Sequence, residues 1–350
     1  MRIQGTKGMR TQGAAMETSM KGKTVLFTGA SRGMGRFAAI ELARRGAKIL
    51  VVGHNEVRGA TAVEAIHGIG GTAEFLRADM GDAEEVRALA DAVLARRASI
   101  DVLIHSAGGM PPSGARTREG VDRGFGQNFL GAFLLTRLLE ERLLASAPAR
   151  VIAVGSAAHR LIKSVDLDAF IRPRKDLSHM GSYKRGSYQM LSYQVAKLAV
   201  TTWIYGLARR WAGRGVTANV LDPGLVKGAF GEQFEGPAPI RVLMNHVFPF
   251  FVAVGPQRGA EQYVRLAADP ALVNVSGTYF VSGKEKKEGS SLLSLDPAVQ
   301  KRVDDVAEAW AAQFLPAHQL ARQSASPSMN GGIEDMNAAA SPAAAKTEGL

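Results

Sequence analysis

Short apolar runs alternate with longer amphipathic segments along most of the chain. Runs rich in Val, Ile and Leu predict strands at residues 24–28, 48–53, 73–78, 101–106, 150–155, 216–221 and 277–281. Apolar positions three and four apart predict helices at residues 36–45, 56–66, 83–97, 120–146, 191–212, 257–268 and 297–314. Because strands and helices alternate, we expect one α/β domain in which about seven strands form a mostly parallel, doubly wound sheet.

The same patterns set the expected domain limits. Residues 1–22 are polar and are expected to form a flexible N-terminal tail, and residues 319–350, rich in Ser, Ala, Pro and Gly, are expected to be disordered. The α/β domain then covers residues 23–318. Within it, residues 157–190 are basic and irregular and are expected to be an insertion, whereas the apolar residues 225–254 are expected to form a substrate lid.

The composition excludes several classes of protein. The chain has no cysteine, which excludes disulfides and thiolate metal sites and fits a reducing, cytoplasmic environment, and we expect no bound metal. The net charge is +11, but Lys and Arg are spread along the chain, so we expect no nucleic-acid partner. No apolar run approaches the ~18 residues of a membrane span, because the longest candidate, residues 247–254, is short and contains Pro249.

A glycine-rich turn follows the first predicted strand and leads into the first predicted helix. Glycines let the backbone approach a diphosphate closely, and the free N–H groups at a helix start favour negative charge. A second strand follows at once, so this βαβ unit suits a dinucleotide, although its spacing G-x-x-x-G-x-G differs from the usual G-x-G-x-x-G. The candidate cofactor contacts in this turn are Gly29, Ser31, Arg32, Gly33, Met34 and Gly35.

The end of the second strand bears on the choice between NAD and NADP. In NAD-binding proteins, an acidic residue about 20 positions after the glycine turn holds the adenosine ribose. Here Gly53, His54 and Asn55 stand at that place. Arg32, inside the turn, could instead hold a 2′-phosphate with two hydrogen bonds, which favours NADP over NAD. In the alternative interpretation, Arg32 is a solvated loop residue and His54 belongs to a turn.

Tyr193 and Lys197 are four residues apart on a predicted helix and therefore share one face. A lysine ammonium beside a phenol favours the phenolate and lowers the pKa of the tyrosine from ~10 towards neutrality, which suits a group that exchanges a proton with a carbonyl oxygen. Ser156, at the end of the fifth strand, could hydrogen-bond the same oxygen. The alternative interpretation is a surface helix that uses both residues for solubility.

Several motifs together resemble the short-chain dehydrogenase/reductase family over residues 23–314. TGASRGMG at residues 28–35 is similar to the family's glycine motif, HSAG at residues 105–108 to its N-N-A-G with two substitutions, and DPG at residues 222–224 to its P-G turn. The residues that match its catalytic tetrad are Asn128, Ser156, Tyr193 and Lys197. NFLGAFLLTRLL, VGSAAHR and PQRGAEQYVRLA look most like the retinol dehydrogenase and protochlorophyllide reductase-like branch.

The resemblance implies a Rossmann-type fold and a role for each matching residue. Tyr193 would exchange the proton with the substrate, Lys197 would lower the pKa of Tyr193 and hold the ribose hydroxyls, and Ser156 would orient the reacting oxygen. Asn128 would anchor a water that relays protons. Asp79 would contact the adenine amine, unless it caps a helix. The further cofactor contacts, expected at the carboxyl ends of strands, are Met80, Ser106, Ala107, Gly108, Pro223, Gly224 and Val226.

Two departures from the family pattern bear on the site. Gly228 stands where the family often has a Thr or Ser that contacts the nicotinamide amide, so that contact must be weakened or supplied elsewhere. Residues 157–190 separate Ser156 from Tyr193 by much more than is usual in the family, which implies an insertion near the substrate mouth. If Ser156 lies away from the site, the candidates to replace it are Ser182, Ser187 and Ser192.

These features predict an NADP-preferring oxidoreductase that transfers a hydride between nicotinamide and a carbonyl or alcohol carbon, with Tyr193 as acid and base. The apolar lid at residues 225–254 predicts a lipophilic substrate. Two alternatives stay open: a C=C reductase on the same scaffold, and a non-catalytic NADP-binding regulatory protein. The basic excess and the apolar stretch near Phe248 suggest weak contact with a membrane surface. The resemblance also implies a homo-oligomer, although the long final segment would block some interfaces.

Overall fold

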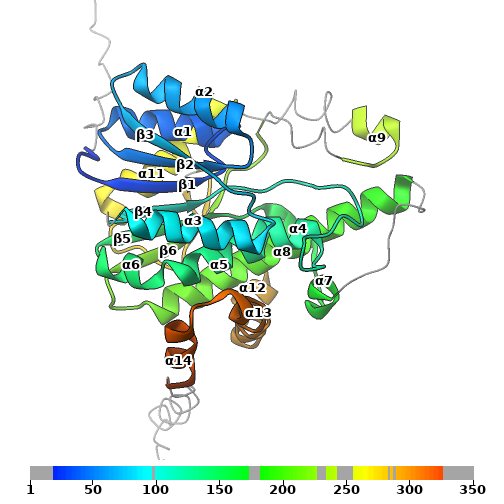
Figure 1. Ribbon diagram of the computed structural model, residues 1–350. Helices are drawn as coiled ribbons and strands as arrows, with labels where there is room; N and C mark the ends of the chain where they lie inside the picture. Colours follow the sequence, from blue (N-terminus) through cyan, green and yellow to red (C-terminus); the bar gives the residue numbers. More distant parts are fainter. Residues whose placement is uncertain are drawn as a thin grey trace, which may run out of the picture.

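A single sheet forms the centre of the computed structural model, which describes residues 19–96, 99–172, 182–226, 234–242, 255–282, 284–286 and 289–325. Its strands are β1 (Thr24–Thr28), β2 (Lys48–Gly53), β3 (Thr72–Arg77), β4 (Val102–His105), β5 (Ala149–Val154), β6 (Val216–Asp222), β7 (Tyr279–Val281) and β8 (Lys284–Glu285). They lie in the order β3-β2-β1-β4-β5-β6-β7-β8 (Figure 1). The first seven are parallel and β8 is antiparallel, so the expected doubly wound α/β sheet is confirmed, with one additional edge strand.

Helices cover both faces of the sheet because successive residues of a strand point to opposite sides. In β1, Val25 and Phe27 pack on one face and Leu26 on the other, and all three are fully buried. The helices on the face of Val25 are α1 (Gly33–Arg44), α2 (Glu56–His67) and α11 (Pro256–Ala268). Those on the face of Leu26 are α3 (Ala83–Ala95), α5 (Gly131–Leu138), α8 (Ser182–Arg210) and α13 (Pro297–Ala311) (Figure 1).

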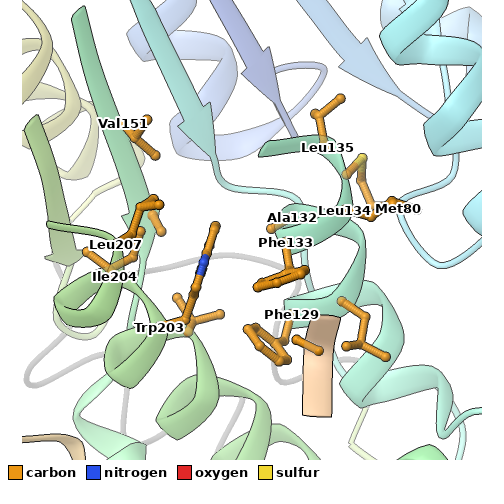
Figure 2. Packing of buried hydrophobic residues seen from close by; sticks show 14 of the residues in the cluster. Met80, Phe129, Ala132, Phe133, Leu134, Leu135, Val151, Trp203, Ile204 and Leu207 are labelled. Atoms are coloured by element: carbon orange, nitrogen blue, oxygen red, sulfur yellow. The ribbon is translucent and has the colours of Figure 1, made fainter. Parts of the chain in front are cut away.

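The single helix predicted at residues 120–146 is wrong, because the segment is broken into four pieces. These are α4 (Arg123–Phe125), a π-helical turn (Gly126–Leu130), α5 and α6 (Glu140–Ala145). Asn128 explains the π turn: its Nδ2 donates to the carbonyl of Gly124 at 2.7 Å, the acceptor that a regular helix would use. The side chain of Met80 is buried in the core (Figure 2). A Cβ on Gly131 would fall 1.9 Å from the backbone oxygen of Met80, so glycine is required at the start of α5.

The helix that carries Tyr193 and Lys197 is longer than predicted. α8 begins at Ser182 rather than at residue 191. Its first turns carry polar residues, which hid the helical pattern, but Gln189 and Ser192 are buried. The expected insertion is therefore partly helical. It contains a 3-10 turn (Ala157–Leu161), α7 (Asp168–Ile171) and the start of α8.

Ordered structure extends beyond the expected limits of the domain at both ends. Met20 is buried, and its N–H donates to the carbonyl of Arg45 at 2.7 Å. At the other end, α14 (Ala317–Ala325) continues past residue 318. The remainder of both expected tails lies outside the described residues. None of the described helices combines the length and the apolar character needed to span a membrane.

An aromatic cluster joins the π-helical turn and α5 to α8. The ring centroid of Trp203 lies 6.1 Å from that of Phe129 and 5.7 Å from that of Phe133 (Figure 2). All three side chains are buried, and truncating an aromatic core residue to alanine typically costs about 3–5 kcal/mol of stability. The cluster therefore fixes the spacing between the turn that carries Asn128 and the helix that carries Lys197.

Candidate active site

The glycine turn lies where the chain crosses from one half of the sheet to the other. β1 pairs with both β2 and β4, so the carboxyl ends of β1 and β4 lie side by side. Gly29 has φ +78°, and a Cβ there would fall 2.7 Å from the backbone nitrogen of Ala107. A Cβ on Gly35 would fall 2.5 Å from the carbonyl oxygen of Gly29. Only glycine fits either position, so the turn packs directly against the segment that follows β4.

The start of α1 has the features of an anion site. Arg32 is its N-cap residue but provides no side-chain cap among the described contacts, and the first turn holds no acidic residue. Gly33 has φ +55°, and a Cβ built there would meet no atom of the described residues within 4 Å. A 12-residue helix whose first residue, Gly33, has free space beside it among the described residues suits a diphosphate. Met34 and Val226 both contact α11 at Gly259, which joins this turn to the loop after β6.

The residues expected at the adenosine ribose form a site without a carboxylate. A Cβ on Gly53 would fall 2.9 Å from the Oγ of Ser31, so this hydroxyl lies over the place where an acidic side chain would begin. Arg32 and His54 are exposed, and within the described part of the chain the guanidinium of Arg32 has no hydrogen-bond or ion-pair partner. Asn55 instead caps α2, because its Oδ1 accepts a backbone N–H of the first turn at 2.9 Å. The sequence did not predict this capping role.

Asp79 stabilises the turn that follows β3. Its carboxylate accepts the N–H of Gly81 at 2.9 Å and pairs with Arg123. Burial alone would raise the pKa of this carboxyl, but the two partners and the nearby His54 outweigh burial and hold the pKa below its usual value. The alternative interpretation of Asp79 as a helix cap is wrong for α3, whose N-cap residue is Asp82.

The segment after β4 is held by side chains from both neighbouring elements. The N–H of Ala107 donates to the Oγ1 of Thr28 at 3.2 Å. The Oγ of Ser106 shares a hydrogen bond of 2.8 Å with the hydroxyl of Tyr263, a fully buried residue of α11 whose pKa burial raises to about 12. These bonds fix the backbone that lies against the glycine turn.

His105, which stands where the family has an asparagine, is buried and neutral. Its Nε2 lies 2.8 Å from the Oγ1 of Thr136, and that hydroxyl donates its own proton to the carbonyl of Ala132 at 2.9 Å. Nε2 must therefore carry the ring proton. Burial lowers the pKa of His105 to about 3. The uncharged ring thus links β4 to α5.

The four residues predicted to be catalytic converge at the carboxyl end of the sheet. Tyr193 is hydrogen-bonded to Ser156. The Nζ of Lys197 lies 5.6 Å from the ring centroid of Tyr193 and donates to the last carbonyl of β5 at 2.8 Å. A Cβ on Gly108 would fall 2.4 Å from the Oδ1 of Asn128 and 3.8 Å from the Nζ of Lys197. Gly108 therefore lies between the two polar side chains and must lack a side chain itself.

Asn128 is held almost completely by the backbone. Its Oδ1 accepts the N–H of Gly109 at 3.1 Å, and its Nδ2 donates to the carbonyls of Gly109 and Gly124 at 2.9 and 2.7 Å. Both amide protons are used, so the side chain can accept one further hydrogen bond, at Oδ1. The one acceptor position that remains on Asn128 is therefore at Oδ1.

The predicted effect of Lys197 on Tyr193 is not present in the protein alone. Burial raises the pKa of Tyr193 to about 12, the hydrogen bond from Ser156 opposes this rise, and the charge of Asp222 adds to it. Burial also lowers the pKa of Lys197 to about 8. The prediction of a tyrosine pKa near neutrality is therefore wrong, because burial raises the pKa of Tyr193, the charge of Asp222 adds to the rise, and the ammonium of Lys197 lies over the ring face.

The structure distinguishes between the serine candidates. Ser156 is the one bonded to Tyr193. Ser192 is buried and donates to Asp122, while Ser187 is exposed. The side chain of the remaining candidate, Ser182, lies outside what the structure describes, as does Gly228, where the family often has a Thr or Ser.

Sequence reasoning missed a buried polar group beneath this site. The carboxylate of Asp222 accepts the N–H of Gly224 at 2.9 Å and the hydroxyl of Tyr279 at 2.8 Å. Tyr279 packs against His159, with ring centroids 5.3 Å apart, and the Nδ1 of His159 donates to the carbonyl of Ser156 at 2.6 Å. The turn at Ser156 and the turn at Pro223 are thus held together. The signal was the Asp that precedes Pro-Gly, which the motif match did not use.

Comparison with known proteins gives a family match and similar dehydrogenases. Residues 23–163 match the short chain dehydrogenase family. Retinol dehydrogenase 14 of Mus musculus is 33% identical over 320 residues, which cover 88% of this chain and 91% of that protein. Retinol dehydrogenase 12 of Homo sapiens is 34% identical over 263 residues, which cover 75% and 78%.

Solved structures agree with this comparison. A crystal structure of an uncharacterised protein from Mycobacterium paratuberculosis has a TM-score of 0.63 and 25% identity, and the match covers 84% of this chain and 95% of that one. A short chain dehydrogenase from Salmonella enterica has a TM-score of 0.58 and 21% identity over 77% of this chain and 99% of that one, which supports the fold alone. The chain therefore belongs to the short chain dehydrogenase family, in its retinol dehydrogenase-like branch, and is an NAD(P)-dependent oxidoreductase.

Proposed function

We propose that this protein is an NADP-preferring oxidoreductase that transfers a hydride between nicotinamide and a carbonyl or alcohol carbon of a lipophilic substrate. The observation that carries the proposal is the hydrogen bond between Tyr193 and Ser156, with Lys197 across the tyrosine ring and Asn128 next to it at Gly108. The names of the relatives support a lipophilic alcohol or the corresponding aldehyde as the substrate, since retinol is a lipophilic alcohol.

Each residue of the group has a task in this reaction. Ser156, once its hydroxyl turns from Tyr193 to the substrate, donates the hydrogen bond that orients the reacting oxygen, and Tyr193 gives this oxygen a proton during reduction or removes it during oxidation. A pKa of about 12 keeps Tyr193 protonated near neutral pH, which is the form that a carbonyl needs. Lys197 holds the ribose hydroxyls, and Asn128 holds a water that returns protons from solvent. The bound nicotinamide supplies or accepts the hydride.

The preference for NADP rests on the adenosine end of the site. Gly53 provides no carboxylate, and Ser31 fills the space above it, so a ribose 2′-hydroxyl lacks the acceptor typical of NAD sites. The exposed cationic side chain of Arg32 and the exposed ring of His54 suit a 2′-phosphate. The diphosphate of the same cofactor would then lie at the start of α1, where Gly33 has free space beside it among the described residues.

Two measurements test the proposal. Titration of the purified protein, followed by nicotinamide fluorescence, should give binding of NADPH at least about tenfold tighter than binding of NADH, and tighter binding of NADH contradicts the assignment of Arg32. Tyr193→Phe should abolish NADPH-dependent reduction of all-trans-retinal while leaving NADPH binding intact. The matched control is Tyr205→Phe, on the same helix but bonded to Ser290, which should keep turnover. Retained turnover in Tyr193→Phe refutes the role of Tyr193.

A further inference from the structure

A buried glutamine joins three segments that are far apart in the sequence. Gln189 lies in the early turns of α8 and is only 3% exposed. Its Nε2 donates to the carbonyl of Met110 at 2.9 Å and to that of Pro111 at 3.0 Å. Its Oε1 accepts the backbone N–H of Glu235 at 2.9 Å. Both ends of one amide therefore connect the loop after β4, the helix α8 and the segment at residue 235.

Glu235 closes this group of contacts. Its Oε2 accepts the backbone N–H of Ser113 at 2.9 Å, which ties residue 235 to the loop after β4 a second time. The backbones of α8 and of this segment also touch, since a Cβ on Gly186 would fall 2.8 Å from the Cα of Gly236. We call the hydrogen bonds of Gln189 and Glu235 the latch.

The latch stands beside the tyrosine of the catalytic group. Gln189 precedes Tyr193 by one helical turn, so the two side chains share a face of α8. A small pocket lies between them and the loop, lined by the residues of 109–113 together with Asp122, Gly124, Tyr188, Gln189, Ser192 and Tyr193. The space left in it is about 10 Å³, which is no more than one water molecule needs. With the latch formed, the described residues therefore leave no room for a substrate between Gln189, the loop after β4 and Tyr193.

We propose that Gln189 and Glu235 form a latch that sets the width of the substrate site beside Tyr193, which makes Gln189 a positioning and specificity-determining residue. The proposal rests on the proposed function, because it assigns a wall to the site of that reaction. An amide suits this position because it offers two protons and an acceptor at once. Removing it takes this partner from the buried carbonyl of Met110 and from the partly buried carbonyl of Pro111 and N–H of Glu235, so the loop and the segment separate from α8 together.

The first test compares a long and a compact aldehyde. Gln189→Ala and Glu235→Ala should raise the ratio of kcat/KM for all-trans-retinal to that for hexanal by about tenfold, because the wall beside Tyr193 recedes. The ratio of the two kcat/KM values is informative, since a general loss of catalysis lowers both values equally and leaves their ratio unchanged. Glu235→Gln should keep the wild-type ratio, because its amide oxygen still accepts the N–H of Ser113. The control Gln194→Ala changes a half-buried residue whose side chain has no hydrogen bond within the described part of the chain, and it should leave the ratio unchanged.

The second test does not depend on activity. Amide hydrogen exchange should become about tenfold faster over residues 109–115 and 234–242 in Gln189→Ala and Glu235→Ala, and should be unchanged in Glu235→Gln. Unchanged exchange in both alanine variants overturns the latch, and faster exchange with an unchanged substrate ratio overturns its role in specificity. If the wild-type protein reduces neither aldehyde, the proposed function fails, whereas the exchange measurement still decides whether the latch exists.

Discussion

The cofactor side and the substrate side of this site are built in different ways. On the cofactor side, backbone packs against backbone: Gly29 lies against Ala107, and Gly35 lies against Gly29, at distances that admit no Cβ. On the substrate side, side chains connect distant segments: Gln189 and Glu235 hold the loop after β4 against α8. Both sides meet at Tyr193 and Lys197 on one helix.

The difference determines what each side can tolerate. A backbone contact at van der Waals distance fails with any substitution, because no side chain can move away. A hydrogen bond between side chain and backbone can be lost or replaced at a cost of about 1–3 kcal/mol, and the fold survives. Substrate preference can therefore change on this scaffold without disturbing the site of the cofactor, and three variants test that separation.

Gly29→Ala should have the largest effect. The new Cβ would lie 2.7 Å from the backbone of Ala107, and φ is +78°. We expect NADPH binding, measured by fluorescence titration, to weaken by about 100-fold or more, with a loss of stability of about 2–3 kcal/mol. Gly70→Ala is the matched control, since Gly70 has φ +75° but a Cβ there meets no described atom within 4 Å. Equal losses of affinity in the two variants would show that strain, not close packing, matters at Gly29.

The same contrast explains how much of the fold could be predicted. The parallel strands were found because both faces are buried and their sequences are continuous apolar runs. The break at residues 123–131 was not found, because it depends on Asn128 bonding the carbonyl of Gly124 and on Met80 crowding Gly131. The start of α8 was missed because residues such as Gln189 are polar and yet buried by partners from elsewhere in the chain.

The residues of the candidate site also divide into those that the sequence predicted and those that it did not. Ser156, Tyr193 and Lys197 could be placed together from the sequence, because spacing along a helix and the ends of parallel strands are local properties. The latch could not be predicted, since its partners are brought together only by the tertiary fold. The pKa of Tyr193 was predicted in the wrong direction for the protein alone, because burial and the charge of Asp222 do not appear in a motif.

Lys197→Met should show how much folding stability is lost by burying the charged ammonium of Lys197, which lies where the two sides of the site meet. The folded pKa of Lys197 is about 8, against a usual value of 10.5. Below pH 8 both the folded and unfolded states bind the proton, so the folded state bears the full cost of burial, about 3 kcal/mol. Between pH 8 and 10.5 the folded protein releases the proton first, and the cost disappears.

The variant carries no such charge. After subtraction of about 1 kcal/mol for the lost bond to Val154, it should be about 2 kcal/mol more stable than the wild type at pH 7. Urea denaturation at pH 7, 8.5 and 10 should show this advantage shrinking as the pH rises, together with loss of turnover at every pH. An advantage that does not change with pH would mean that Lys197 is not buried as a cation.

Asp122→Asn should have the smallest effect and should act on the substrate side alone. The Oδ2 of Asp122 accepts the hydroxyl of Tyr188 at 2.8 Å, and its Oδ1 accepts the N–H of Phe125 at 2.9 Å and the hydroxyl of Ser192. An asparagine keeps one of these oxygens and turns an N–H₂ group towards Tyr188, so about 1 kcal/mol of stability should be lost.

Because Ser192 adjoins Tyr193, kcat should fall by up to about tenfold, whereas the affinity for NADPH should not change. Tyr188→Phe removes the same contact from the other partner. If the contact carries the effect, the double variant should lose no more activity than Asp122→Asn alone. If the losses of activity add up, Asp122 acts through its bond to Phe125 and the π turn rather than through Tyr188. If the affinity for NADPH also falls, the cofactor side and the substrate side are not separable.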